Sequence, residues 1–241
     1  MPVATETLLA AALVLVYLID SASFLALGEG VIATRRGALL GLSSGSAFEL
    51  GGRRPFLPNP LTPFWPELRI EWATWCGPGA PAAIAAREMR EQLRALRGIG
   101  ALSGVCALLM VGVAPLALAL SASRLFLACA LLSYLLAGLA GALIVARRRA
   151  FGLTLPQAIL VLAVGVVCLP CAGNLARAAA GRRRWLLAAS EIPQLGFSAP
   201  REASVRRELA GSLRFAARFL AEDGAEARII GDELARLERP A

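Results

Sequence analysis

The chain has 241 residues, of which 57% are hydrophobic, with a formal net charge of +8 and a mean hydropathy of +0.64. These values exclude an ordinary soluble globular protein, because the apolar residues are gathered in blocks rather than spread in periodic patterns. All 25 basic residues are arginine, and there is no histidine, which excludes His-based triads, proton shuttles and His metal ligands. We therefore expect no metal and no cofactor. The positive charge is more typical of arginines that flank membrane segments than of nucleic-acid binding, so no nucleic-acid partner is expected.

Four apolar runs predict helices in a lipid bilayer. The first lies in residues 1–27, and the others fill residues 100–176 as 100–120, 125–146 and 155–176. About 20 apolar residues suffice to cross a bilayer, and a helix is the default form there because it satisfies its own backbone hydrogen bonds. The sequence therefore predicts an all-α integral membrane protein with three to four transmembrane helices, a small β-rich, Pro/aromatic cytoplasmic insert and a C-terminal helical tail.

The arginines predict the orientation of these helices. Arg35 and Arg36 follow the first run, which favours an N-terminus outside and a cytoplasmic 28–99 loop in a bacterial cytoplasmic (inner) membrane. The last run, 155–176, has arginines on both sides, so a full crossing would place one group on the unfavoured face. Two paths remain open for it: a complete crossing, which its length allows, or a re-entrant dip that returns near Pro170.

The composition of residues 28–79 predicts a small soluble insert. Short strand-like pieces separated by Gly and Ser are followed by five closely spaced prolines, which favour extended backbone. Five aromatic residues of this insert are candidate contacts for a partner protein or for the bilayer surface: Phe56, Phe64, Trp65, Trp72 and Trp75. A small β-rich cap that packs its own aromatic rings is the third interpretation.

Residues 80–99 predict a basic amphipathic surface helix. Apolar side chains recur there at three- and four-residue steps, and four arginines occupy the opposite side: Arg87, Arg90, Arg94 and Arg97. This pattern is typical of a helix that lies on lipid headgroups, and a solvated helix packed on the insert is the alternative.

Small residues in the apolar runs predict close helix packing. Gly100 and Gly104 form a GxxxG motif, and Ser133, Ala137 and Gly141 form a stripe at four-residue spacing. The soluble tail, residues 177–241, contains two amphipathic patterns, 198–223 and 225–239. We expect these helices to pack as a hairpin against the insert or a partner.

One cysteine pair has the spacing of a redox site. Cys168 and Cys171 form a C-x-x-C at the end of the last apolar run, a spacing that can close a redox disulfide, although buried cysteines also serve as small packing residues. Residues 75–78 match the first four residues of the thioredoxin Trp-Cys-Gly-Pro-Cys motif, with Gly79 in place of the second Cys. Four helices with a C-x-x-C in the fourth resemble the vitamin K epoxide reductase family, whose first loop carries a cysteine pair where this chain has only Cys76. The resemblance implies thiol–disulfide chemistry.

The leading functional interpretation is non-enzymatic. It is a membrane-anchored accessory or assembly protein that docks a protein partner or a larger membrane complex through its insert and tail. The alternative is a membrane thiol–disulfide oxidoreductase that uses Cys168 and Cys171. A third interpretation, a small transporter or channel, rests on Asp20, the only acid well inside an apolar run, which could equally be hydrated near the interface.

Overall fold

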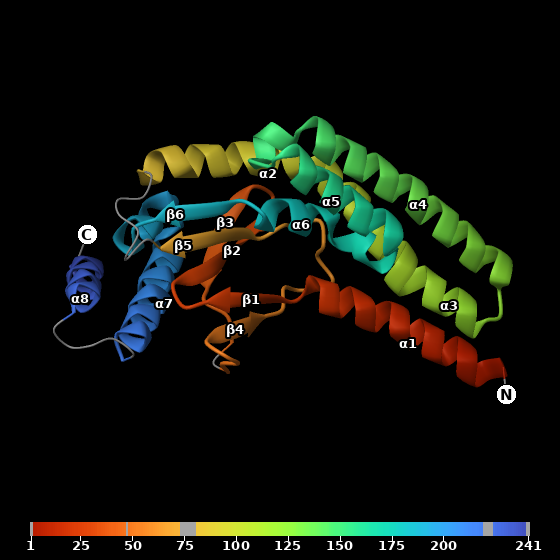
Figure 1. Ribbon diagram of the computed structural model, residues 1–241, viewed down its shortest axis with the longest axis horizontal. Helices are drawn as coiled ribbons and strands as arrows, with labels where there is room; N and C mark the ends of the chain where they lie inside the picture. The colour runs from red at the N-terminus through yellow and green to blue at the C-terminus, as the bar shows by residue number, and fades with distance from the viewer. Residues whose placement is uncertain (1, 47, 73–80, 219–223, 240–241) are drawn as a thin grey trace. The chain divides into compact units, whose positions relative to one another are not determined.

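The computed structural model describes residues 2–46, 48–72, 81–218 and 224–239 (Figure 1). Its contacts divide the chain into two compact units, which we describe separately. Unit 1 comprises Met1–Ser23, Leu57–Pro66 and Gln92–Arg183, and unit 2 comprises Phe24–Phe56, Glu67–Glu91 and Arg184–Ala241. Each unit is therefore assembled from three stretches of chain, and the insert predicted at 28–79 contributes to both.

The prediction of an all-α integral membrane protein with three to four transmembrane helices is wrong. The described residues form eight α-helices and six β-strands, and the strands make two sheets. In the same residues, two helical stretches are long and apolar enough to cross a bilayer, Ala82–Ala119 and Ser123–Ala146, whereas Leu155–Val167 is apolar but has only 13 residues. The insert and the tail are not appendages of a helical bundle, because together they build a unit of strands and helices.

Four of the six strands lie in the part of the chain expected to be a small insert, whereas β1 lies at the end of the run 1–27, expected to be wholly helical, and β6 lies in the tail. The larger sheet has the order β3-β2-β5-β6, in which β6 is parallel to β5 and the other neighbours are antiparallel. The smaller sheet pairs β1 with β4. The strands are β1 Ser23–Ala26, β2 Glu29–Arg35, β3 Ala38–Ser43, β4 Arg53–Phe56, β5 Leu68–Trp72 and β6 Arg184–Leu187. Because β6 comes from the tail, the tail is not only a helical hairpin but also completes a sheet of the insert.

The core of unit 2 follows from the alternation of β5 and β6. Leu68, Ile70 and Trp72 are buried on one face of β5, and Trp185 and Leu187 are the buried positions of β6. After β6 come the 3₁₀-helix η4 (Ala189–Leu195) and the helices α7 (Ala199–Ala217) and α8 (Ala225–Glu238), which occupy the two ranges where periodicity predicted helices. The Glu208 carboxylate of α7 accepts hydrogen bonds from the N–H (3.1 Å) and hydroxyl (2.5 Å) of Ser44, next to the end of β3.

A buried carboxylate joins three strands of the larger sheet. Glu29 in β2 forms ion pairs with Arg69 of β5 and with Arg184 of β6, and it accepts a hydrogen bond from the N–H of Ala26. Burial would raise the pKa of Glu29, but the hydrogen bonds from Ala26 and Arg69 and the charges of both arginines together lower it. Glu29 is therefore held ionised between its two partners.

The helices of unit 1 include one long continuous run. The amphipathic helix expected at 80–99 and the apolar run expected at 100–120 join without a break as α2, η1 and α3, although the first ten residues of α2 belong to unit 2. The elements are α1 Pro2–Ser21, α2 Ala82–Ala107, the π-helix η1 Leu108–Val113, α3 Ala114–Ala119, α4 Ser123–Ala146, the 3₁₀-helix η2 Arg148–Phe151, α5 Leu155–Val167, the 3₁₀-helix η3 Pro170–Asn174 and α6 Leu175–Gly181.

The π turn of the long helix has a local cause. Pro115 has no N–H, and its ring would collide with the carbonyl of Val111 in a regular α-helix. The wider turn at Leu108–Val113 accommodates the ring without interrupting the helix, so the buried face continues from Met110 to Ala114 and Ala117.

Candidate functional site

The last apolar run is broken near its middle. A capping box starts α5: Thr154 accepts the N–H of Gln157, and the Gln157 side chain accepts the N–H of Thr154. The helix ends at Val167, Cys168 adopts an extended conformation, and Pro170 stands at the start of η3, where its missing N–H costs nothing. The run predicted at 155–176 is thus a short helix, a turn and a second short helix.

This segment returns to the end from which it started. A Cβ on Gly165 of α5 would lie 2.7 Å from Cδ2 of Leu175 in α6, so the two legs are in close contact. At the open end, a Cβ on Gly152 would lie 3.2 Å from Cδ of Arg183. Of the two paths left open by the sequence, the structure therefore has the returning one. We call residues 155–181 the disulfide hairpin.

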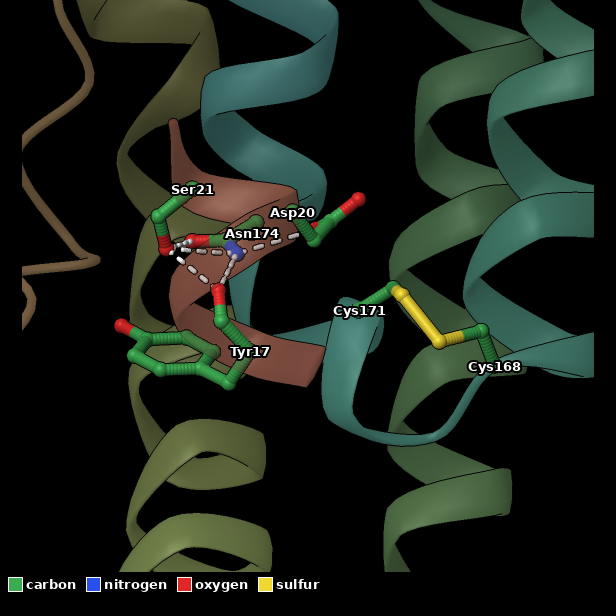
Figure 2. The surroundings of a disulfide bond; sticks show 6 residues. All are labelled: Tyr17, Asp20, Ser21, Cys168, Cys171 and Asn174. Atoms are coloured by element: carbon green, nitrogen blue, oxygen red, sulfur yellow. Dashed lines mark hydrogen bonds between the residues drawn. A yellow bond between two sulfur atoms is a disulfide. The ribbon is translucent and has the colours of Figure 1, made fainter. Parts of the chain in front are cut away.

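A disulfide between Cys168 and Cys171 closes the tip of the hairpin (Figure 2). Their Cα atoms are 5.2 Å apart, a normal distance for a disulfide. Cys168 is half-buried, whereas Cys171 is only 8% exposed. The other cysteines in the described part of the chain, Cys106 and Cys129, are free and buried. Cys168 is thus the more exposed residue of the pair.

The tip lies toward the end of unit 1 at which α4 begins. Leu169 packs on a cluster made by Met110, Ala114 and Cys129. Cys129 is six residues after the first residue of α4, which corresponds to about 9 Å along the helix. Along the other leg, the 13 residues of α5 reach about 20 Å from the open end. The 24 residues of α4 span about 36 Å, so the tip of the hairpin points away from the open end and lies a little beyond the middle of the helical unit.

Asn174 is the centre of a polar cluster beside the disulfide (Figure 2). Its Nδ2 lies within hydrogen-bond distance of three oxygens of α1: the Ser21 hydroxyl at 2.9 Å, Oδ2 of Asp20 at 3.0 Å and the carbonyl of Tyr17 at 3.3 Å. Its Oδ1 accepts from Nη1 of Arg177 at 3.3 Å. Asn174 is buried, so these contacts satisfy polar groups that water does not reach, and they fasten the hairpin to α1.

Arg177 and Tyr17 extend this cluster to the segment Leu57–Pro66. Nη2 of Arg177 donates to the carbonyls of Asn59 (2.6 Å) and Thr62 (3.1 Å). The Tyr17 hydroxyl donates to the carbonyl of Pro60 at 2.6 Å. The guanidinium group of Arg177, three residues after Asn174, therefore donates to backbone carbonyls of this segment.

The predicted aromatic contacts are placed in different environments. Trp72 is 2% exposed and belongs to the core of unit 2. Phe64 and Trp65 meet edge to face with ring centroids 4.8 Å apart in unit 1, and Phe56 is half-buried in β4. Trp75 lies outside the described residues. An interface role for Phe56, Phe64 and Trp65 stays a prediction.

The predicted headgroup arginines are all on the outside of α2. The exposed residues are Arg87, Arg90, Arg94 and Arg97, and the buried ones on the other side are Ala82, Ala86, Met89, Leu93 and Leu96. Nε of Arg87 pairs with Glu91 at 3.1 Å. Their contact with lipid stays a prediction.

The predicted packing residues meet three different partners. A Cβ on Gly100 would lie 2.8 Å from the carbonyl oxygen of Phe64, and one on Gly104 would lie 3.2 Å from its ring, so the GxxxG motif accommodates the Leu57–Pro66 segment rather than a helix. On α4, Gly141 faces Leu162 of α5, and the carbonyl of Ser133 lies 3.9 Å from Sγ of Cys106. Ala137 lies between them in the sequence and is also buried.

Sequence reasoning missed Asn174 and Tyr17. The only signal for Asn174 is a strongly polar side chain two residues before the end of a run whose one other amide, Gln157, lies next to its start. Asp20 was noted, and the structure places it at the edge of the cluster, with its carboxylate hydrogen-bonded to Asn174 and otherwise exposed. In the described ranges, no group of three His, Cys, Asp or Glu side chains gathers that could hold a metal ion.

Comparison of this chain with models of protein families, with curated proteins and with solved structures finds no match. What the site can do must therefore be argued from its own chemistry.

Proposed function

We propose that unit 1 is embedded in a lipid bilayer and exchanges its Cys168–Cys171 disulfide with the dithiol of a protein partner. The membrane part rests on which side chains point outward. In the most apolar windows of Ala82–Ala119 and Ser123–Ala146, only 28% and 33% of the residues are buried. Leu127, Leu131 and Leu135 of α4 are 69%, 62% and 64% exposed. A core helix of a soluble protein would bury these residues, whereas lipid is a favourable solvent for them.

The arginines give the orientation of unit 1 in this proposal. The open end of the hairpin carries Arg183, and Nη1 of Arg147 at the end of α4 donates to the carbonyl of Ala95 in α2 at 3.4 Å. Arg124 is at the other end, at the start of α4. Arginines are enriched on the cytoplasmic side, so the open end faces the cytoplasm of a bacterial cell, and the tip with the disulfide points toward the outer face, the side on which disulfides persist.

The single observation that carries the exchange proposal is the disulfide at the tip of the hairpin, between a half-buried and a buried cysteine residue. A thiolate of the partner attacks Sγ of Cys168, the disulfide breaks, and Cys171 leaves and takes up a proton. The second thiol of the partner then displaces Cys168, which leaves as a thiol. The partner loses two electrons and two protons and gains a disulfide, and the protons end on Cys168 and Cys171.

The experiment uses the full chain in mild detergent and a reduced peptide with a Cys-x-x-Cys sequence. We expect the wild-type chain to oxidise the peptide in a 1:1 ratio and to gain two thiols, measured by mass spectrometry after alkylation. Cys171→Ser, which cannot form the disulfide, should leave the peptide reduced. A Cys-x-x-Ser peptide, which lacks the second thiol, should instead be trapped on the wild-type chain as a mixed disulfide at Cys168, with Cys171 released as a thiol. Cys129→Ser, which removes a buried thiol of the same unit, should behave as wild type. A disulfide that the peptide leaves intact over hours, in a chain that alkylation shows to be folded, would overturn the proposal.

A second candidate function, docking of a protein partner by unit 2, is favoured by two exposed apolar residues. Phe48 and Leu50 are 65% and 59% exposed, directly before the turn at Gly51 and Gly52. Exposed aromatic and aliphatic side chains at a loop tip are typical anchors of protein contacts. Under this proposal the chain elutes from a mild-detergent extract as part of a larger complex, and Phe48→Ser with Leu50→Ser releases it. Elution of the wild-type chain as a lone monomer would refute it.

A further inference from the structure

We propose that the open end of the disulfide hairpin binds the headgroups of anionic phospholipids. Its arginines come from three segments that are far apart in the sequence and that unit 1 brings to one end. We call these residues the arginine collar: Arg94 and Arg97 of α2, Arg147, Arg148 and Arg149 at the end of α4, and Arg182 and Arg183 after α6.

Contacts within unit 1 join the three segments. The hydrogen bond from Nη1 of Arg147 to the carbonyl of Ala95 places the end of α4 beside α2, between Arg94 and Arg97. The side chain of Arg183 lies over Gly152, whose N–H in turn donates to the carbonyl of Arg149 at 3.1 Å. The end of α4 thus lies between the other two segments, and contacts of the fold hold the collar together.

The collar has a strong excess of positive charge. Residues 92–183 contain nine arginines and no acidic residue. The other stretches of unit 1 contribute two acids, Glu6 and Asp20, and both are engaged elsewhere: Glu6 lies 3.4 Å from the hydroxyl of Ser121 at the opposite end, and Asp20 contacts Asn174. The side chains of Arg94, Arg97 and Arg147 are exposed.

The phosphate groups of lipids carry the charge opposite to that of the collar, and in the proposed membrane placement they lie at the same level. Arginine presents several N–H donors in a fixed fork that suits phosphate oxygens, and it stays charged at every physiological pH. The exposed Leu155 and Ile159 of α5 lie at the open end of the hairpin, so a lipid whose tails cover these side chains places its phosphate near the collar. Basic residues at this level attract anionic lipids of the cytoplasmic leaflet, at about fivefold in affinity for each arginine.

The inference rests on the membrane placement proposed above but not on disulfide exchange. The test uses the full chain in mixed micelles of phosphatidylglycerol and phosphatidylcholine in equal amounts, with retained lipids counted by native mass spectrometry. We expect phosphatidylglycerol to be retained at least tenfold over phosphatidylcholine. The double variant Arg147→Gln/Arg183→Gln should lose most of this preference, and Arg124→Gln, at the other end of α4, should keep it.

The outcomes separate the alternatives. Equal retention of the two lipids, or the same loss of preference in Arg124→Gln as in the double variant, would overturn the collar as a lipid site. Displacement of phosphatidylglycerol by 50 mM inorganic phosphate would also overturn it, because the collar would then bind free phosphate rather than lipid. Retention of neither lipid would overturn the membrane placement itself. Because the double variant leaves the hydrogen bonds of Asn174 and the disulfide in place, its peptide oxidation should stay at the wild-type level.

Discussion

Asn174→Leu should destabilise unit 1 more than any other single change of an amide side chain. The substitution preserves most of the volume but removes the contacts of Asn174 with Asp20, Ser21 and Arg177. Asp20 is exposed and regains water, and the Ser21 hydroxyl and the Tyr17 carbonyl keep the hydrogen bond between them, so the lasting loss falls mainly on the buried Arg177. Removing a partner from a buried polar group costs about 1–3 kcal/mol, and more for a charged group, so we expect the free energy of unfolding to fall by about 2–4 kcal/mol.

For a chain of this size, each kcal/mol lost from the free energy of unfolding lowers the thermal unfolding midpoint by about 2–4 °C, so the midpoint should fall by about 5–15 °C. The assay follows the reaction of a thiol-specific dye with Cys106 and Cys129 in a Cys76→Ser background, because both free thiols are buried in unit 1 and react only when it opens. The matched control is Asn59→Leu, which removes an exposed Asn that accepts one N–H, from Leu61. A midpoint for Asn174→Leu within 2 °C of that of Asn59→Leu would refute the reasoning.

Three further predictions use single residues with a clear environment. Gly141→Ala should lower the free energy of unfolding by about 1–3 kcal/mol, measured with the same dye, because the added Cβ would lie 2.1 Å from Cδ1 and 3.0 Å from Cβ of Leu162. The control is Gly138→Ala: a Cβ there would have nothing within 4 Å, so this change should leave the stability unchanged or raise it. Gln92→Met should raise the midpoint, because the amide of Gln92 is fully buried and neither polar atom has a hydrogen-bond partner; a lower midpoint would show that the amide has a role. Glu29→Gln should destabilise unit 2 at neutral pH but not in acid. Because folding lowers the pKa of Glu29, its ionised carboxylate contributes fully to stability above the unfolded-state pKa of about 4.3. This contribution is lost as the pH falls through the lower folded-state pKa. Urea unfolding of both proteins between pH 7 and pH 3 checks this, and a constant difference would contradict it.

Some elements could be predicted because their signal is local. The buried positions Met89, Leu93 and Leu96 of α2 are the ones that the helical period selects, and the opposite side consists of charged side chains that must stay hydrated. The burial of Trp72 could also be predicted from the sequence. Leu68, Ile70 and Trp72 are two residues apart and therefore share one face of β5. The nearby prolines and aromatic residues made Trp72 resemble a partner contact, although its alternation with Leu68 and Ile70 indicates the core.

Other elements depend on contacts between distant parts of the chain. The strand β6 has four residues, too few for a periodic signal, and it becomes a strand because β5 offers it an edge to pair with. The path of the disulfide hairpin was undecided because a 22-residue apolar run is long enough to cross. Pro170 marks the break, but only the packing of Gly165 against Leu175 sets the direction of return. Asn174 could not be identified as a hub, since its partners are about 150 residues away.

The π turn at Leu108–Val113 has a consequence for how this chain tolerates changes in length. Such a turn amounts to one residue inserted into an α-helix. Loss of one residue inside the turn would let the backbone relax to the ordinary pitch while Ala114 and Ala117 still face inward. Loss of one residue in the regular part of α2 would instead rotate everything beyond it by about 100° and move Leu118 into the buried position of Ala117. Relatives of this chain that differ in length within the long helix should therefore differ inside that one turn.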